Sequence, residues 1–212
     1  MKDFYNRYIN NEIKFDRLTL LGIIFLFVVI SGIFGFVYEF IFYYFNGGMK
    51  EFYMRGSNFL PFINIYATGS LIIYILTRNM KKSPFKIFLI SVLATGILEF
   101  VSGYVMYEFF GGFRCWDYNT EILNFGNIGG YVCLRSVLFF GISSLLLVYG
   151  IIPMCYYLAS ILNKKVFIIL SYSLFLIFMF DDIYNLLIAR IFDLKRASDI
   201  YKSLGFKYVS FK

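Results

Sequence analysis

Histidine is absent from this 212-residue sequence, which also contains only three cysteines, three prolines and one tryptophan. Without histidine, a histidine-based metal site is excluded. Cys115, Cys133 and Cys155 are widely separated and lack the paired spacing of a thiolate zinc site. We therefore expect no metal centre and no cofactor.

Charged residues are also scarce. They make up 16% of this chain, whereas soluble domains average about 25%. Hydrophobic residues make up 60%, and the mean hydropathy is +0.72. The apolar residues form continuous runs rather than an alternating pattern, which favours helices over a β-barrel. The sequence predicts an all-α, polytopic transmembrane helical bundle with about five spanning helices.

The apolar runs locate the expected helices, since a crossing helix needs about 20 apolar residues. Residues 18–38, 56–77 and 136–163 reach this length without a charge. Residues 87–98 and 166–180 reach it only by including Glu99 in one run and Asp181 and Asp182 in the other. The expected helices are 18–45, 59–77, 85–110, 131–162 and 166–192.

The fourth expected helix contains a proline in its interior. Gly150 and Pro153 lie within the fourth run, and we expect them to kink the helix or to end it there.

Three segments describe the organisation of the chain: a polar lead-in at 1–17, the transmembrane bundle at 18–192 and a basic tail at 193–212. The first apolar run is too long for a signal peptide, so we expect it to remain as a spanning helix. The tail has apolar residues at helical spacing, as in helices that lie on a membrane surface: Leu194, Ala197, Tyr201 and Leu204.

The net charge of +7 indicates membrane lipids rather than nucleic acid as the partner, because the basic residues flank apolar runs. The two sides of the predicted membrane carry nearly equal numbers of basic residues, so this count does not decide the orientation of the chain. The flanks of the first helix favour a cytoplasmic N-terminus.

Charged residues inside or beside the predicted spans fall toward the side of the membrane where the first helix ends. We expect opposite charges to meet there, because buried charges persist in lipid only when they are paired or used. The predicted substrate-binding or ion-pair pocket comprises Glu39, Arg55, Glu99, Arg114, Asp117, Arg135 and Asp182.

Each acidic residue of this set also has a purely structural interpretation. Gly32, Gly35 and Glu39 share one helix face, which suits close helix packing with a single structural ion pair. Ser91, Thr95 and Glu99 form a polar stripe that faces either the bundle interior or a water-filled cavity; we rank Glu99 above Glu108, which lies on the opposite face.

Two further groups also have two interpretations. The aspartates Asp181 and Asp182 either enter the bundle or lie in water beyond a helix that ends before them. Trp116 and Tyr118 serve either as headgroup anchors or as the flanks of a loop that Asp117 pins over a pocket.

Several motifs together resemble a known family. They are Gly35 and Glu39 late in the first helix, Arg55-Gly56 opening a segment that includes Tyr66 and ends at Gly69, Glu99, the Trp116-Asp117-Tyr118 loop, and Asn124, Gly130, Cys133 and Leu134. Between about residues 35 and 141, the chain resembles the putative ABC-transporter type IV family of CmpB-like bacterial membrane proteins. Departures from the family pattern are Leu60, Asn64, Ala67 and Phe140.

The resemblance implies a multi-pass protein of the bacterial cell membrane. The sequence has no G-x-x-x-x-G-K-[ST] phosphate loop, so the chain cannot hydrolyse ATP as an ABC ATPase does. A transporter role therefore requires a separate ATPase subunit.

Three functions remain open from the sequence. The first is a permease-like transporter subunit that binds a polar solute or lipid headgroup, with Arg55 and Arg135 holding an anionic group and Glu39 and Glu99 balancing them or relaying a proton. The second is a membrane-embedded enzyme acting on a lipid, against which the absence of histidine counts. The third is a structural or regulatory subunit whose charges lock helices together. The oligomeric state is open.

Overall fold

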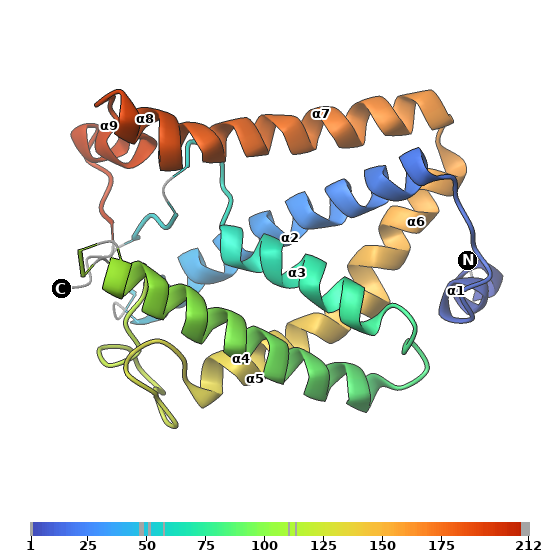
Figure 1. Cartoon of the computed structure of the whole chain (residues 1–212), viewed down its shortest axis with the longest axis horizontal. Coiled ribbons are helices and arrows are strands. Elements are labelled where there is room, and N and C mark those ends of the chain that lie inside the picture. Colours follow the sequence, from blue (N-terminus) through green and yellow to red (C-terminus); the bar gives the residue numbers. More distant parts are fainter. Residues whose placement is uncertain are drawn as a thin grey trace. The chain divides into compact units, whose positions relative to one another are not determined.

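The computed structural model of the chain describes residues 2–46, 49–50, 52–56, 58–109, 111–112 and 114–208. Within these ranges the regular structure is helical (Figure 1). β-Structure there is limited to two isolated bridges. The prediction of an all-α fold is therefore confirmed. The helices are α1 (Lys2–Ile9), α2 (Arg17–Asn46), α3 (Asn64–Thr77), α4 (Pro84–Phe109), α5 (Leu134–Leu146), η1 (Leu147–Ile151), α6 (Ile152–Ile161), α7 (Lys164–Ile183), η2 (Tyr184–Ile188), α8 (Ala189–Ile191) and α9 (Ala197–Ser203).

Four helical stretches in the described ranges are long and apolar enough to cross a membrane: Arg17–Asn46, Pro84–Phe109, Leu134–Ile161 and Lys164–Ile191. The shortest has 26 residues, which at ~1.5 Å per residue gives about 39 Å, more than the ~30 Å of a hydrocarbon core. The predicted second span corresponds to the shorter apolar helix α3.

The outer faces of these helices are apolar. On α4, Leu93 and Ile97 are 67% and 65% exposed, and on α7, Leu176 and Phe180 are 64% and 66% exposed. Large apolar side chains exposed along a continuous helix are unfavourable in water but are suited to contact with lipid tails. These faces therefore fit helices surrounded by lipid.

The chain forms two compact units, each assembled from separated segments. Unit 1 comprises residues 1–15, 68–157 and 211–212, and unit 2 comprises 16–67 and 158–210. In unit 1, α4 packs along α5, and α1 contacts the loop before α4 and segment η1. The α4–α5 contact is close at Gly96, where a Cβ would lie 3.1 Å from Val137.

In unit 2, α2 packs along α7. Gly22 of α2 lies against Phe167 and Ser171 of α7, and the Phe25 and Phe175 rings are stacked with centroids 4.1 Å apart. Further along α2, glycines admit the segment that leads into α3. A Cβ on Gly32 would overlap the Phe62 ring, so this position requires glycine.

The predicted start of the second helix at residue 59 is wrong, because α3 begins at Asn64. Pro61 disfavours helical geometry at the preceding residue. The N–H groups of Phe59 and Leu60 donate instead to Asp181 on α7, at 3.0 and 2.7 Å. A tertiary contact therefore holds this segment outside the helix.

The predicted fourth helix is continuous from Leu134, three residues later than expected, to Ile161, and it does not end at Pro153. The stretch preceding Pro153 adopts π-helical geometry, η1. A widened turn of this kind accommodates a proline inside a helix. The predicted helix end at residue 110 and the tail residues 209–212 lie outside the described ranges.

Candidate functional site

The polar stripe of α4 lies inside unit 1. Ser91, Thr95 and Glu99 are four residues apart and 0%, 1% and 2% exposed. The Thr95 hydroxyl donates to the Ser91 carbonyl oxygen at 2.7 Å, which satisfies that hydroxyl within its own helix. Glu99 therefore enters the interior from the middle of a spanning helix. By contrast, Glu108 is exposed.

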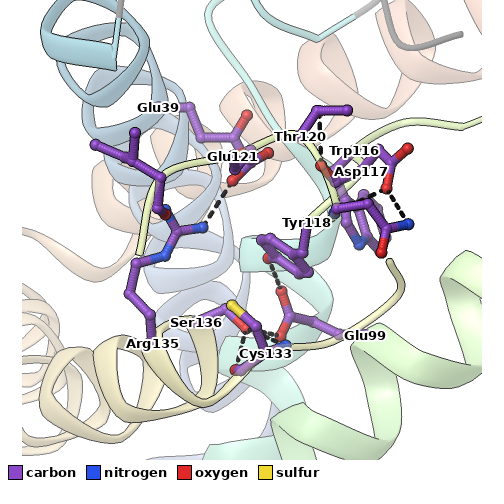
Figure 2. Close-up of polar contacts among 12 residues, drawn as sticks. Glu39, Glu99, Trp116, Asp117, Tyr118, Thr120, Glu121, Cys133, Arg135 and Ser136 are labelled. Carbon is purple, nitrogen blue, oxygen red and sulfur yellow. Dashed lines mark hydrogen bonds and ion pairs between the residues drawn. The ribbon is translucent and has the colours of Figure 1, made fainter. Parts of the chain in front are cut away.

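Two hydroxyl groups contact the Glu99 carboxyl group (Figure 2). The Tyr118 hydroxyl donates to Oε1 at 2.5 Å, and Ser136 Oγ lies 2.7 Å from Oε2. Tyr118 comes from the loop after α4, and Ser136 lies in the first turn of α5. Three separate segments thus build this carboxyl site.

The Ser136 hydroxyl can serve Glu99 in either protonation state. Ser136 Oγ lies within hydrogen-bond distance of Glu99 Oε2 and of the Cys133 carbonyl oxygen, 2.8 Å away, but it carries only one hydrogen. If Ser136 donates to an ionised Glu99, the Cys133 carbonyl still accepts the Val137 N–H at 3.2 Å. If a protonated Glu99 donates to Ser136, the serine hydrogen can serve the carbonyl as well. The geometry therefore accommodates the carboxyl group with or without a proton.

The loop between α4 and α5 is organised around Asp117. Its Oδ1 accepts the backbone N–H of Asn119 at 3.0 Å and the Asn119 amide at 2.8 Å, and it lies 3.4 Å from Arg114 Nη1. The Arg114 guanidinium stacks over the Tyr107 and Tyr131 rings at 4.5 and 5.2 Å. Asp117 thus fixes the turn that contains Tyr118, whose hydroxyl donates to Glu99.

Two further contacts fix this loop. Trp116 Nε1 donates to the Tyr131 carbonyl at 2.8 Å, and the Tyr118 N–H donates to the Gly130 carbonyl at 3.1 Å. Gly130 has φ +80°, and a Cβ there would lie 2.5 Å from atoms of Arg114, Asp117 and Asn119. Only glycine fits this position.

Arg135 pairs with a residue that the sequence analysis did not single out. Its Nη2 lies 2.7 Å from Glu121 Oε2, its Nη1 donates to the Ile122 carbonyl at 2.9 Å, and its guanidinium lies 5.3 Å from the Tyr118 ring centre (Figure 2). Glu121 is 7% exposed and needs a positive partner. Charge balance across the 114–135 segment was the sequence signal that could have identified it.

In unit 2, Arg55 pairs with Glu39. Arg55 Nε lies 2.6 Å from Glu39 Oε2, and their side chains are 10% and 16% exposed. The guanidinium also stacks over Tyr43, one helical turn beyond Glu39, at 4.4 Å. Tyr66, at the start of α3, packs on Gly35, one turn before Glu39. The motifs around Gly35, Glu39 and Arg55 therefore meet in one cluster.

The two aspartates of α7 hold the segment before α3. Asp181 accepts the Phe59 and Leu60 N–H groups, and Asp182 accepts the Asn58 and Asn64 amides at 3.3 and 2.6 Å. The interpretation in which the helix ends before them is wrong, because α7 continues to Ile183 and Asp181 is 7% exposed.

The ten predicted site residues divide between the units. Unit 1 contains Glu99, Arg114, Trp116, Asp117, Tyr118 and Arg135, and unit 2 contains Glu39, Arg55, Tyr66 and Asp182. That the seven charged residues of this set share one pocket stays a prediction. In the described ranges, no three histidine, cysteine, aspartate or glutamate residues form a group that could hold a metal ion.

Several apolar helices of spanning length, with lipid-suited outer faces and buried carboxyl groups, define a multi-pass helical membrane protein. The family model described as putative ABC-transporter type IV matches residues 25–186. The chain therefore belongs to this family, as its motifs predicted, and the match extends beyond them at both ends. Comparison with curated proteins gives no match, and neither does comparison with solved structures.

Proposed function

We propose that the chain is the permease-like membrane subunit of a transporter in a bacterial cell membrane, and that Glu99 carries a proton during transport. The observation that supports this most is the Glu99 carboxyl group, 2% exposed and in contact with two hydroxyl groups. An ionisable residue inside a spanning helix is costly and commonly marks an ion or substrate path.

The contacts of Glu99 favour proton exchange over simple packing. Ser136 can accept from a neutral Glu99 or donate to an ionised one, because the Cys133 carbonyl also has the Val137 N–H as a donor. Loss of the proton would reverse the hydrogen bond between Glu99 and Ser136. Protonation of this one residue would thus change contacts at the start of α5, as a coupled transport step requires.

The solute that we propose is polar and anionic, either free or as a lipid headgroup. Arg114 and Arg135 of unit 1 would bind it, since guanidinium groups suit planar anions, and Arg55 offers a similar group within unit 2. Each now faces a carboxylate, of Asp117, Glu121 and Glu39 respectively. An incoming anion would exchange with these carboxylates. Asp182, Tyr66, Trp116 and Tyr118 would hold the surrounding backbone.

We further propose that a separate ATPase subunit supplies the energy. The family description contains the term ABC-transporter, and this sequence has no phosphate loop. Affinity purification of the tagged chain from its native membrane should recover a soluble ATPase. Purification that yields the chain without any ATPase would contradict this part of the proposal.

Glu99→Gln tests the transport role directly. In cells that depend on the chain for uptake or growth, we expect at least a tenfold loss of activity at normal protein abundance. Glu108→Gln, on the same helix but exposed, is the matched control and should retain activity. Wild-type activity of the Glu99→Gln protein would refute the role.

Infrared spectroscopy tests the proton itself. The purified wild-type protein should show a carbonyl band of a neutral carboxylic acid that is missing in Glu99→Gln and present in Glu108→Gln. A spectrum that is the same in all three proteins would show that Glu99 is ionised at rest.

A structural role is the second candidate, because every arginine of the proposed site already has a carboxylate partner. In this case Glu39→Gln and Arg55→Ala should lower abundance without changing activity per molecule. The exchange of the two charges, Glu39→Arg with Arg55→Glu, should then restore abundance.

A further inference from the structure

Pro153 leaves a backbone acceptor without its helical donor in unit 1. At the end of η1, the Ile152 N–H donates to the Leu147 carbonyl, five residues earlier. In the same register, the next carbonyl is that of Val148 and the next donor would be residue 153. Proline has no N–H. An unpaired carbonyl in an apolar interior is costly.

Tyr8 of α1 supplies the missing hydrogen bond. Its hydroxyl donates to the Val148 carbonyl at 2.8 Å, across 140 positions of the chain. The Tyr8 side chain is 1% exposed. Burial and the neighbouring tyrosines raise the pKa of Tyr8 well above its usual value, so the hydroxyl remains a donor at any physiological pH. The amino-terminal helix thus completes a helix that belongs to a distant part of the sequence.

Lys81 joins α1 to the same place from the loop before α4. Its side chain is 6% exposed, and its Nζ donates to the Tyr8 carbonyl at 3.0 Å. The ammonium lies 3.6 Å from the centre of the Tyr8 ring and 5.6 Å from that of Tyr156. Tyr149, within η1, donates its hydroxyl to the Lys81 carbonyl at 2.7 Å. Helix α1, Lys81 and η1 therefore form one connected network.

We propose that α1 is an intramolecular latch that controls the π-helical segment of the third long span. Docked α1 caps the Val148 carbonyl and holds η1 in its widened register. Release of α1 uncaps this carbonyl and lets the segment shift register. π-Helical turns are frequent at functional sites. The latch thus offers a means of switching the conformation of a spanning helix from outside the membrane.

Proton binding at Lys81 gives the latch a pH dependence. Burial lowers the pKa of the Lys81 amine from 10.5 to about 8. Between these two pKa values, Lys81 therefore binds fewer protons when α1 is docked than when it is released. Docking of α1 thus becomes stronger as the pH rises from about 8 to 10.5. The titratable or charged groups around the Lys81 and Tyr8 network are Tyr5, Tyr8, Tyr74, Arg78, Tyr149 and Tyr156.

Hydrogen exchange of the full-length protein in detergent or nanodiscs tests the latch, read as protection factors of residues 2–9 and 147–152. Tyr8→Phe should lower protection in both segments by about tenfold, which corresponds to the loss of one hydrogen bond. Tyr5→Phe is the matched control, because Tyr5 lies on the same helix with 38% exposure. It should leave both segments unchanged.

Pro153→Ala makes the test specific, because it supplies the missing N–H. In the Pro153→Ala background, Tyr8→Phe should lower the protection factors of residues 147–152 by less than threefold. Lys81→Met should abolish the rise in α1 protection between pH 8 and pH 10.

The latch is refuted if residues 2–9 of the wild-type protein exchange as fast as an unstructured peptide. It is also refuted if Tyr8→Phe matches wild type, or if its effect is the same with and without Pro153. The wild-type measurement decides even if a variant fails to fold.

Discussion

Glu99 in unit 1 and Glu39 in unit 2 are the same residue type in comparable spanning helices, yet their partners differ. Glu39 lies 2.6 Å from the Arg55 guanidinium, which stacks on Tyr43. Glu99 contacts the hydroxyl groups of Tyr118 and Ser136. A guanidinium can only donate hydrogen bonds, whereas a hydroxyl group can donate or accept them.

The difference separates two uses of buried acid. In unit 2, Glu39 pairs with Arg55 and Asp181 accepts two backbone N–H groups, so both side chains hold separate segments together. In unit 1, the hydrogen arrangement allows Glu99 to gain and lose a proton at little structural cost. Substitutions that remove each charge should therefore have very different effects on stability.

The largest effect is expected at Asp181. Asp181→Asn replaces one of two acceptor oxygens with an NH₂ group, which leaves the Phe59 or the Leu60 N–H without its acceptor. We expect a loss of about 3 kcal/mol in the free energy of unfolding, measured by denaturant titration in detergent. Asp193→Asn, at an exposed position, is the control and should be close to neutral. Equal stability of the two variants would contradict the structural role of Asp181.

A smaller loss is expected for Glu39→Gln, because it leaves the Arg55 guanidinium without its carboxylate. We expect a loss of about 2–3 kcal/mol in the same titration. The double variant Glu39→Gln with Arg55→Met should recover part of this loss, because no charge then remains unpaired. A double variant no more stable than Glu39→Gln would mean that the pair is not the source of the effect.

The loop that carries Tyr118 should be sensitive at Gly130. Gly130→Ala forces a Cβ to within 2.5 Å of neighbouring side-chain atoms at φ +80°. We expect a loss of about 1–2 kcal/mol in the free energy of unfolding. Trp116 fluorescence should also be quenched more easily by an added quencher, since Trp116 donates a hydrogen bond to Tyr131 in the same loop. Gly205→Ala, also at positive φ but with no atom within 4 Å of the added Cβ, separates backbone strain from the clash. If both variants lose the same stability, the packing around Gly130 is not tight.

The smallest stability effect is expected for Glu99→Gln. Glutamine presents an oxygen and an NH₂ group, as a neutral glutamic acid presents an oxygen and an OH, so the Tyr118 and Ser136 contacts can persist. We expect a change below about 1 kcal/mol and the loss of the proton-dependent function. A destabilisation as large as that of Glu39→Gln would remove the distinction between the two glutamates.

Much of the fold could be predicted because hydropathy is a local property of the sequence. The first span was expected at 18–45 and is observed at Arg17–Asn46. The second start was missed by five residues, because Asp181 withdraws the Phe59 and Leu60 N–H groups from helix formation. Nothing near Phe59 in the sequence signals a donor contact more than 120 positions away.

Most residues of the candidate site could be predicted from the sequence, but only some of their partners could. The motif residues Glu39 and Arg55 stood out as buried charges, and their pairing follows from opposite sign. Glu121 was missed because it lies in a loop without periodicity, and Tyr8 was missed because a tyrosine in a polar segment carries no pattern.

The sequence by itself determined the membrane class, the four long spans and the family, because a lipid environment demands long apolar helices and few charges. Only the tertiary structure decided which group meets which: hydroxyls at Glu99, a guanidinium at Glu39, and the Tyr8 hydroxyl at the carbonyl left open by Pro153. The physical reason is that hydrogen bonds and ion pairs depend on ångström-scale distances between residues that the sequence keeps far apart.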